Sequence, residues 1–220
     1  MVRPLLITDC DEVLLHMVRH FRTWLDEAHA IDFDIGAGDF ATSIRRRDGV
    51  ALERDDMWAL LGGFFPAEMA RQTLVPHAAE ALGRIAQVAD IVVLTNLQDG
   101  CNQARVEQLA AFGIHHRVVT NQGGKGTPVA ALVAEHGDPV TVFVDDLAVH
   151  HDSVARHAPG VHRLHMVSDE TLAAAMPAAP AAHTRIDDWR AAERWILDRF
   201  AAGVPAAATE KAETAETAET

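Results

Sequence analysis

The chain has 220 residues and carries 19 basic against 32 acidic side chains, which gives a formal net charge of −13. Apolar residues make up 49% and charged residues 23%, so wholesale disorder, collagen and coiled coil are excluded. This length favours a single domain, or a domain with an inserted sub-domain. Such an acidic body repels phosphate backbones, so we expect no nucleic-acid partner, and work on a phosphate would require a metal ion or a local cation.

The cysteines and the apolar runs indicate a cytoplasmic protein. Cys10 and Cys101 are too few for a disulfide framework and are expected to be small packing residues. The first apolar run is too short for the core of a signal peptide and stops at Asp9. No run approaches the roughly 18 uninterrupted apolar residues of a transmembrane helix, so no membrane partner is expected.

Four short apolar runs predict buried parallel strands. They are rich in Val, Ile and Leu and do not alternate with polar residues, as expected for a sheet covered on both faces. They span residues 5–8, 91–95, 117–120 and 140–144, and the more alternating run 161–167 is expected to be an edge strand. Helical spacing lies between them at 77–88, 101–112, 128–136 and 148–157. This alternation predicts an α/β fold with a Rossmann-like open parallel sheet.

Turn and capping residues support these boundaries. Thr127 followed by Pro128 is a favourable helix start, with a capping hydroxyl and a proline at the first helical position. Gly113 and Gly137 are expected to end the helices that precede them.

The region after the first strand predicts a helical cap. Residues 13–30 form a long amphipathic pattern, 31–50 are irregular, and 55–61 and 66–72 are shorter helical segments. We therefore expect an α/β core at 1–13 and 77–203 and a cap at 14–76. In the core's last part we expect a loop at 173–182 and a final helix at 187–201. Residues 204–220, which end in repeated Ala-Glu-Thr, are expected to be a disordered acidic tail.

Polar side chains follow each predicted strand. Since ligands of open parallel sheets bind beyond the carboxyl ends of the strands, these side chains are candidates for a site. Carboxylates crowded at one sheet edge repel one another unless a cation joins them, and Mg²⁺ suits carboxylate oxygens together with a substrate phosphate. In chain order the candidates are Asp9, Asp11, Thr95, Asn96, Lys125, Asp145 and Asp146.

Lys125 stands out because lysine is rare in this chain. The sequence holds Lys125 and Lys211 against 17 arginines, and Lys211 lies in the tail. Gly123, Gly124 and Gly126 flank Lys125. A compact charge on a flexible stem is useful against a phosphate or a nucleophilic carboxylate, although a solvated loop lysine is the usual alternative.

Together these segments resemble the motifs of the haloacid dehalogenase-like hydrolase superfamily. ITDCDEV is similar to its first motif, VVLTN to its second, GGKGTP to its third and VFVDD to its fourth, in the family's order. The resemblance implies a Rossmann-like core, and a helical insertion between the first two motifs corresponds to the family's type-one cap.

The resemblance also implies roles for the candidate residues. Asp9 would be the nucleophile that forms an aspartyl-phosphate, and Asp11 the general acid and base. Thr95 would donate a hydrogen bond to the phosphoryl group and Lys125 would neutralise charge on the nucleophile and the phosphate, while Asn96 would either contact the substrate or fix the turn. Mg²⁺ would be bound by Asp9, Asp145, Asp146 and the backbone carbonyl of Asp11.

Three features lie outside these motifs. Glu12 stands where the family usually has glycine, and its side chain could crowd the loop that leads to the cap. The run Arg45–Arg46–Arg47 is either a contact for a substrate anion or a solvated basic loop. Of the histidine pair His150 and His151, one residue could support the acidic site from behind.

The leading hypothesis is a Mg²⁺-dependent phosphatase acting on a small phosphorylated metabolite. A 2-haloacid dehalogenase would use the same nucleophile but lacks the second aspartate, so Asp11 favours the phosphatase. A receiver domain places its acid pair first and has no cap, which disfavours it. A degenerate member with a binding or regulatory role is the remaining alternative, supported by Glu12 alone.

Overall fold

The computed structural model describes residues 2–37 and 43–207. Its centre is a six-stranded sheet in the order β10-β9-β8-β1-β6-β7, and every pairing in it is parallel. The strands are β1 (Leu5–Thr8), β6 (Asp90–Asn96), β7 (Arg117–Asn121), β8 (Thr141–Asp145), β9 (His162–His165) and β10 (Thr184–Arg185). The predicted Rossmann-like α/β fold is confirmed.

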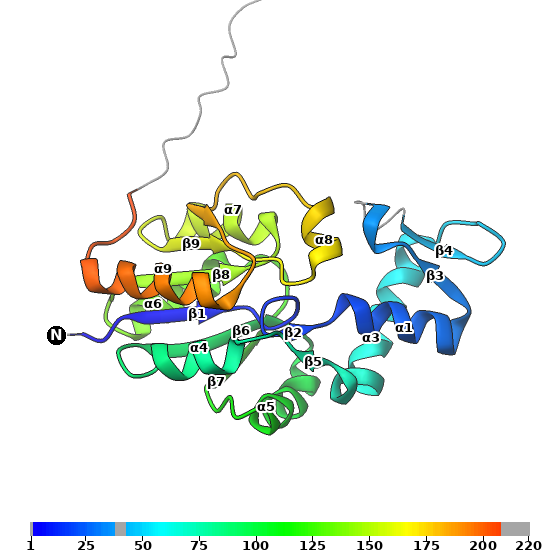
Figure 1. Ribbon diagram of the computed structural model, residues 1–220, viewed down its shortest axis with the longest axis horizontal. Helices are drawn as coiled ribbons and strands as arrows, with labels where there is room; N and C mark the ends of the chain where they lie inside the picture. Colours follow the sequence, from blue (N-terminus) through cyan, green and yellow to red (C-terminus); the bar gives the residue numbers. More distant parts are fainter. Residues whose placement is uncertain (1, 38–42, 208–220) are drawn as a thin grey trace, which may run out of the picture.

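Helices cover both faces of this sheet (Figure 1). On one face, Leu6 and Val93 join the apolar cluster that includes Leu82 of α4 (Ala78–Ile85) and Ile196 of α9 (Trp189–Ala202). On the other face the cluster includes Ile7, with side chains of α6 (Gly126–Glu135) and α7 (Ala148–His157). Burial on both sides explains why the strands read as continuous apolar runs.

Two further helices complete the core. The helix α5 (Asn102–Ala111) packs beside β7, and the short helix α8 (Glu170–Ala175) lies near the 3₁₀ turn η1 (Ile35–Ala37). A further 3₁₀ turn, η3 (Asp99–Cys101), precedes α5. Both free cysteines lie in this core, Cys10 buried and Cys101 partly exposed.

The segment expected to be a cap forms a unit with its own apolar cluster, at the right of Figure 1. It contains α1 (Val18–His29), a hairpin of β3 (Ile31–Phe33) and β4 (Ile44–Arg46), and α3 (Arg54–Glu68) followed by the 3₁₀ turn η2 (Met69–Arg71). Phe21 and Phe64 pack edge to face at its centre, with ring centroids 5.3 Å apart. The two connections to the core pair with each other as β2 (Leu15–His16) and β5 (Thr73–Leu74). We call this unit, residues 17–72, the cap.

Several expected boundaries shift in the structure. The first cap helix begins at Val18 instead of residue 13, because Leu14 and Leu15 are drawn into the core cluster. The stretch 31–50 holds the β3–β4 hairpin, and the helical segments at 55–61 and 66–72 become α3, which continues through Pro66, and η2. The edge strand is β10 and not the run 161–167, since Thr184 pairs with Leu164 of β9.

The structure confirms two of the predictions about helix ends and contradicts the predicted helix start. Gly113 and Gly137 have φ of 77° and 79° after their helices, the left-handed conformation expected of helix ends. Thr127 does not cap α6, because the helix begins earlier and Lys125 holds the N-cap position. Part of the expected loop at 173–182 belongs to α8. Of the expected disordered tail, residues 208–220 lie outside the described part, while the amide of Ala206 donates to the carbonyl of Gly160.

Candidate active site at the carboxyl ends of the strands

The floor of the site is a buried chain of opposite charges. The ammonium of Lys125 lies 2.7 Å from Oδ1 of Asp9 and 2.7 Å from Oδ2 of Asp145. Asp9 follows β1 and Asp145 ends β8, its neighbour in the sheet, so the parallel register brings the two carboxylates to one edge. Lys125 and Asp145 have no exposed surface, and a buried charge is tolerated only when it is paired in this way.

The glycine after Lys125 allows the lysine to reach this position. A Cβ on Gly126 would collide with the carbonyl oxygen of Ser153 in α7, so only glycine lets α6 approach α7 this closely. The amide of Gly126 also donates to Oγ of Ser153 at 3.0 Å. The Gly-rich segment therefore serves helix packing as well as the placement of Lys125.

Three carboxylates of the floor could hold a metal ion. One oxygen each of Asp9, Asp145 and Asp146 lies within 4.8 Å of the others, and all three residues are buried. Their donors are hard oxygens, the kind that Mg²⁺ prefers. The Asp11 carboxylate is not part of this group, and only the backbone carbonyl of Asp11 was expected to bind the ion.

The protonation tendencies of these acids show that the floor lacks positive charge. Burial raises the pKa of Asp9 to about 7, with Asp145 adding to the increase and Lys125 opposing it. Burial and repulsion from Asp145 raise the pKa of Asp146 well above its usual value. Burial acts the same way on Asp145, but Lys125 outweighs it and lowers its pKa. One lysine facing three acids leaves room for a divalent cation, so the residues present fit Mg²⁺.

Two buried histidines hold the backbone of the acid pair from behind. Nε2 of His151 lies 3.0 Å from the carbonyl oxygen of Asp145, and Nε2 of His165 lies 2.8 Å from that of Asp146. Nδ1 of His165 accepts from the amide of Ala179, so its Nε2 carries the proton that points at the carbonyl. Burial lowers the pKa of His151 to about 4, so this ring is neutral in the folded protein.

Asp11 is held by a buried arginine that carries no motif in the sequence. Nη2 of Arg105, from α5, lies 3.0 Å from both carboxylate oxygens of Asp11. The same guanidinium donates to Sγ of Cys10 and to Oε1 of Gln72, and Nε2 of Gln72 donates back to Asp11. Arg105 has no exposed surface, so Asp11 is fixed from the core side by a buried polar network, in which Nε of Arg105 is the one guanidinium nitrogen without a hydrogen-bond partner among the described residues.

Thr95 and Asn96 lie at the end of β6, as expected, but most of their polar atoms are used within the protein. The hydroxyl of Thr95 is 3.5 Å from Oδ2 of Asp11. Nδ2 of Asn96 donates to the carbonyl of Gly123 and lies 3.3 Å from Nε2 of His150. Asn96 thereby ties the end of β6 to the loop that carries Lys125.

Glu12 fits the structure in a way that its sequence position did not suggest. Its backbone is left-handed, with φ of 60°, which explains why glycine is favoured there. Its Oε1 accepts from the amides of Met17 and Val18 at 2.8 and 2.5 Å, at the start of α1. Hydrogen bonds to the free amides at a helix start offset the backbone strain. Glu12 therefore links the loop that carries Asp9 and Asp11 to the cap helix and does not crowd that loop.

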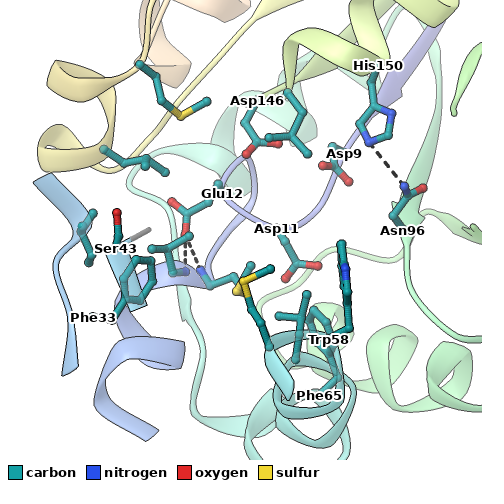
Figure 2. Close-up of a pocket in the computed structure, with 18 of the residues that line it drawn as sticks. Asp9, Asp11, Glu12, Phe33, Ser43, Trp58, Phe65, Asn96, Asp146 and His150 are labelled. Atoms are coloured by element: carbon teal, nitrogen blue, oxygen red, sulfur yellow. Dashed lines mark hydrogen bonds between the residues drawn. The ribbon is translucent and has the colours of Figure 1, made fainter. Parts of the chain in front are cut away.

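A cavity of about 800 Å³ opens above this floor, between the core and the cap. Figure 2 shows Asp9, Asp11, Glu12 and Asp146 on its core side, with Phe33, Ser43, Trp58 and Phe65 from the cap opposite them. Asn96 and His150 also line it. Lys125 and Thr95 are buried beneath the lining, with no exposed surface.

The arginine run of the cap points elsewhere. Arg46 pairs with Asp56 and Arg47 pairs with Asp26, in exposed ion pairs on the cap surface. Nη1 of Arg45 lies 3.4 Å from the carbonyl oxygen of Gly49. The solvated basic loop, and not the contact with a substrate anion, matches this arrangement.

Sequence reasoning missed Arg105, His165 and the capping role of Glu12. Arg105 sits at a regular position of a helix, and His165, the last residue of β9, lies inside the run 161–167 that was expected to be strand, so neither follows an expected strand end. A signal for Arg105 was available in hindsight: it is a charged residue on the buried face of an amphipathic helix. Such a residue requires a buried partner.

Comparison with solved structures identifies the fold. A haloacid dehalogenase-like hydrolase of Streptococcus pneumoniae matches with a TM-score of 0.61 and 10% identity over 87% of this chain and 97% of its own. A predicted phosphoglycolate phosphatase of Haemophilus somnus matches with 0.59 and 17% identity, over 89% and 99%. YfnB of Bacillus subtilis, assigned to the same hydrolases and solved with magnesium bound, matches with 0.61 and 14% identity, over 89% and 99%.

The chain therefore has the haloacid dehalogenase-like fold, as the motifs implied. Neither a protein-family model nor a curated protein sequence matches it. Within the described residues, none of the helices has the length and apolar character needed to cross a membrane.

Proposed function

We propose that this protein is a Mg²⁺-dependent phosphatase that hydrolyses a small phosphomonoester through an aspartyl-phosphate. The observation that carries the proposal is the position of Asp9, which lines the cavity while Lys125 pairs with it from below and Asp145 and Asp146 lie beside it. The magnesium-bound relative of the same fold supports the choice of metal.

Two successive displacements at phosphorus describe the reaction. An oxygen of Asp9 forms a bond to phosphorus while the bond to the leaving alkoxide breaks, and Asp11 gives that alkoxide its proton. A water molecule then attacks the same phosphorus, loses its proton to Asp11, and releases Asp9 and inorganic phosphate. Mg²⁺, held by oxygens of Asp9, Asp145 and Asp146, would neutralise the charge of the phosphoryl group.

The contacts of Asp11 place a condition on this scheme. Its Oδ1 accepts from Arg105 and Gln72 and its Oδ2 from Arg105 and Thr95, so neither oxygen has a lone pair left for the proton that Asp11 would donate. Substrate must therefore loosen one of these contacts before the first displacement. The oxygen nearer Thr95, Oδ2, is the one we expect to carry the proton.

Phosphate release tests the proposal. Wild-type protein and Asp9→Asn are compared on a broad panel of phosphomonoesters, with Mg²⁺ and with EDTA. We expect Mg²⁺-dependent release that falls at least about 1000-fold in Asp9→Asn, because the amide cannot attack phosphorus. Asp90→Asn is the matched control: this aspartate lies at the opposite end of β6, in an exposed pair with Arg3.

The outcomes separate the alternatives. Release that persists in Asp9→Asn would contradict the mechanism. Halide release from 2-haloacids in EDTA would favour the dehalogenase, and Mg²⁺ binding without any release would favour a binding role.

A further inference from the structure

The cavity above the acids is large, and its described lining is mostly apolar and includes no lysine or arginine. Its volume of about 800 Å³ exceeds the need of a two-carbon leaving group and lies in the range of sites for drug-sized molecules. Every charged residue among its described lining residues is an acid: Asp9, Asp11, Glu12 and Asp146. Its apolar residues include Met17, Val18, Phe33, Ile35, Leu52, Met57, Trp58, Leu61, Phe65, Leu147, Leu172 and Met176.

Four arginines of the described part of the chain are engaged away from this space. Arg46 and Arg47 form exposed ion pairs, and Arg19 pairs with Asp169 at 2.8 Å. Arg105 lies behind Asp11 and is fully buried. A leaving group with a carboxylate or a second phosphate would therefore lose its water without gaining a cation from the described lining, which is costly.

One acid of the lining has an oxygen without a protein partner. Glu12 is 2% exposed, and its Oε1 is satisfied by the start of α1. Its Oε2 is buried and accepts no hydrogen bond. Figure 2 shows Glu12 between the acids of the core and the cap residues Phe33 and Ser43, on the wall of the cavity.

We infer that the leaving group is a largely apolar alcohol that carries no second anion and that donates a hydrogen bond, from an ammonium or a hydroxyl group, to Oε2 of Glu12. The inference rests on the proposed function, since it takes the phosphate to lie at the floor. The apolar wall supplies area for binding, and Glu12 supplies the directional contact that selects among apolar alcohols. A buried carboxylate oxygen left unpaired is costly, so the donor restores a bond that the free protein lacks.

Matched non-hydrolysable probes test this inference independently of turnover. Benzylphosphonate and its aminomethyl, hydroxymethyl and carboxy derivatives share one apolar body and differ only in the added group. The meta and para isomers of each derivative place the added group at different distances from phosphorus, so that different phosphorus-to-Glu12 distances are tested. Their dissociation constants are measured by calorimetry with wild-type protein in excess Mg²⁺.

We expect the aminomethyl and hydroxymethyl probes to bind at least about tenfold more tightly than the carboxy probe, and the unsubstituted probe to lie between them. Tightest binding of the carboxy probe, or no binding of any probe, would overturn the inference. The relative affinity of the aminomethyl and hydroxymethyl probes decides between the two donors.

Two variants locate the contact. Glu12→Gln keeps an oxygen for the amides of Met17 and Val18 but presents an NH₂ group in place of Oε2. We expect it to lose the preference for the aminomethyl probe over benzylphosphonate, whereas the matched charge change Glu170→Gln, at an exposed position of α8, keeps it. Retention of the preference in Glu12→Gln, with unfolding like that of wild type, would show that Glu12 does not meet the donor.

Hydrolysis of phenyl phosphate is measured beside binding, so the two proposals can fail separately. Selective binding of the probes without any Mg²⁺-dependent hydrolysis would contradict the phosphatase and leave the ligand class standing. Hydrolysis that favours phosphoglycolate over phenyl phosphate would support the phosphatase and contradict the ligand class.

Discussion

The two sides of the cavity are held in place by different forces. On the core side, buried charges hold one another: Lys125 joins Asp9 and Asp145, and Arg105 clamps Asp11. On the cap side, apolar side chains pack around Phe21 and Phe64 and present their outer members to the cavity. A reaction at phosphorus requires particular groups at fixed positions, whereas selection of an alcohol requires only shape and the absence of unsuitable charge. The comparison can be tested from both sides.

The largest effect on stability is expected from the centre of the cap. Phe64 is fully buried and packs edge to face against Phe21 and Trp24, so Phe64→Ala should lower the free energy of unfolding by about 3–5 kcal/mol. Phe65, its neighbour, lines the cavity and is only partly buried. Phe65→Ala should cost less stability, about 1–2 kcal/mol, and raise KM for an aromatic phosphate about tenfold. Urea unfolding and steady-state kinetics measure both, and equal stability losses would remove the distinction between support and lining.

The second test removes the clamp on the core side. Arg105→Met leaves Asp11 without its bidentate partner, and we expect the free energy of unfolding to fall by about 3 kcal/mol and kcat/KM by about 100-fold. Arg105→Lys restores the positive charge but not the planar guanidinium donors. It should therefore recover more of the free energy of unfolding than of kcat/KM. Arg117→Met is the control, because its exposed pair with Glu135 should contribute no more than about 1 kcal/mol. Wild-type kcat/KM in Arg105→Met would show that Asp11 needs no clamp.

The core side could be predicted from the sequence more fully than the cap side, and the reason is physical. The strand ends were predicted because the chemistry demands acids, a lysine and a hydroxyl immediately after apolar runs, and β1 and α7 have the expected bounds. The cap was predicted only as helical, and its β3–β4 hairpin was missed because short, half-exposed strands have weak patterns. Arg105 and Glu12 were missed as supports because their partners are distant in sequence or lie across the link to the cap.

The third test concerns the metal. Three buried carboxylates destabilise the metal-free protein, so Mg²⁺ should raise the melting temperature of wild type by several degrees, which corresponds to about 2.7 kcal/mol at 100 times its Kd. Asp146→Asn removes one of these charges. We expect the variant to be at least as stable as wild type in EDTA, and to gain much less from Mg²⁺. Thermal unfolding across a Mg²⁺ titration measures this, and an unchanged Mg²⁺ response in Asp146→Asn would place the ion elsewhere.

The smallest effect is expected from the histidines behind the acid pair. Burial lowers the pKa of His151 to about 4, against about 6.5 in an unfolded chain. Between these values the unfolded state binds more protons, so the stability contributed by the neutral ring is complete above about pH 6.5 and is lost as the pH falls toward 4.

His151→Gln removes this titration and retains an N–H for the carbonyl of Asp145. The variant should therefore lose about 1–2 kcal/mol less than wild type when the pH is lowered from 7 to 5, in urea unfolding followed at both values. His115→Gln, at an exposed position before β7, should follow wild type. Parallel curves for His151→Gln and wild type would mean that the ring has the same pKa in the folded and the unfolded protein. The core side of the cavity would then carry more positive charge at about pH 6 than the pairing of one lysine with three acids indicates.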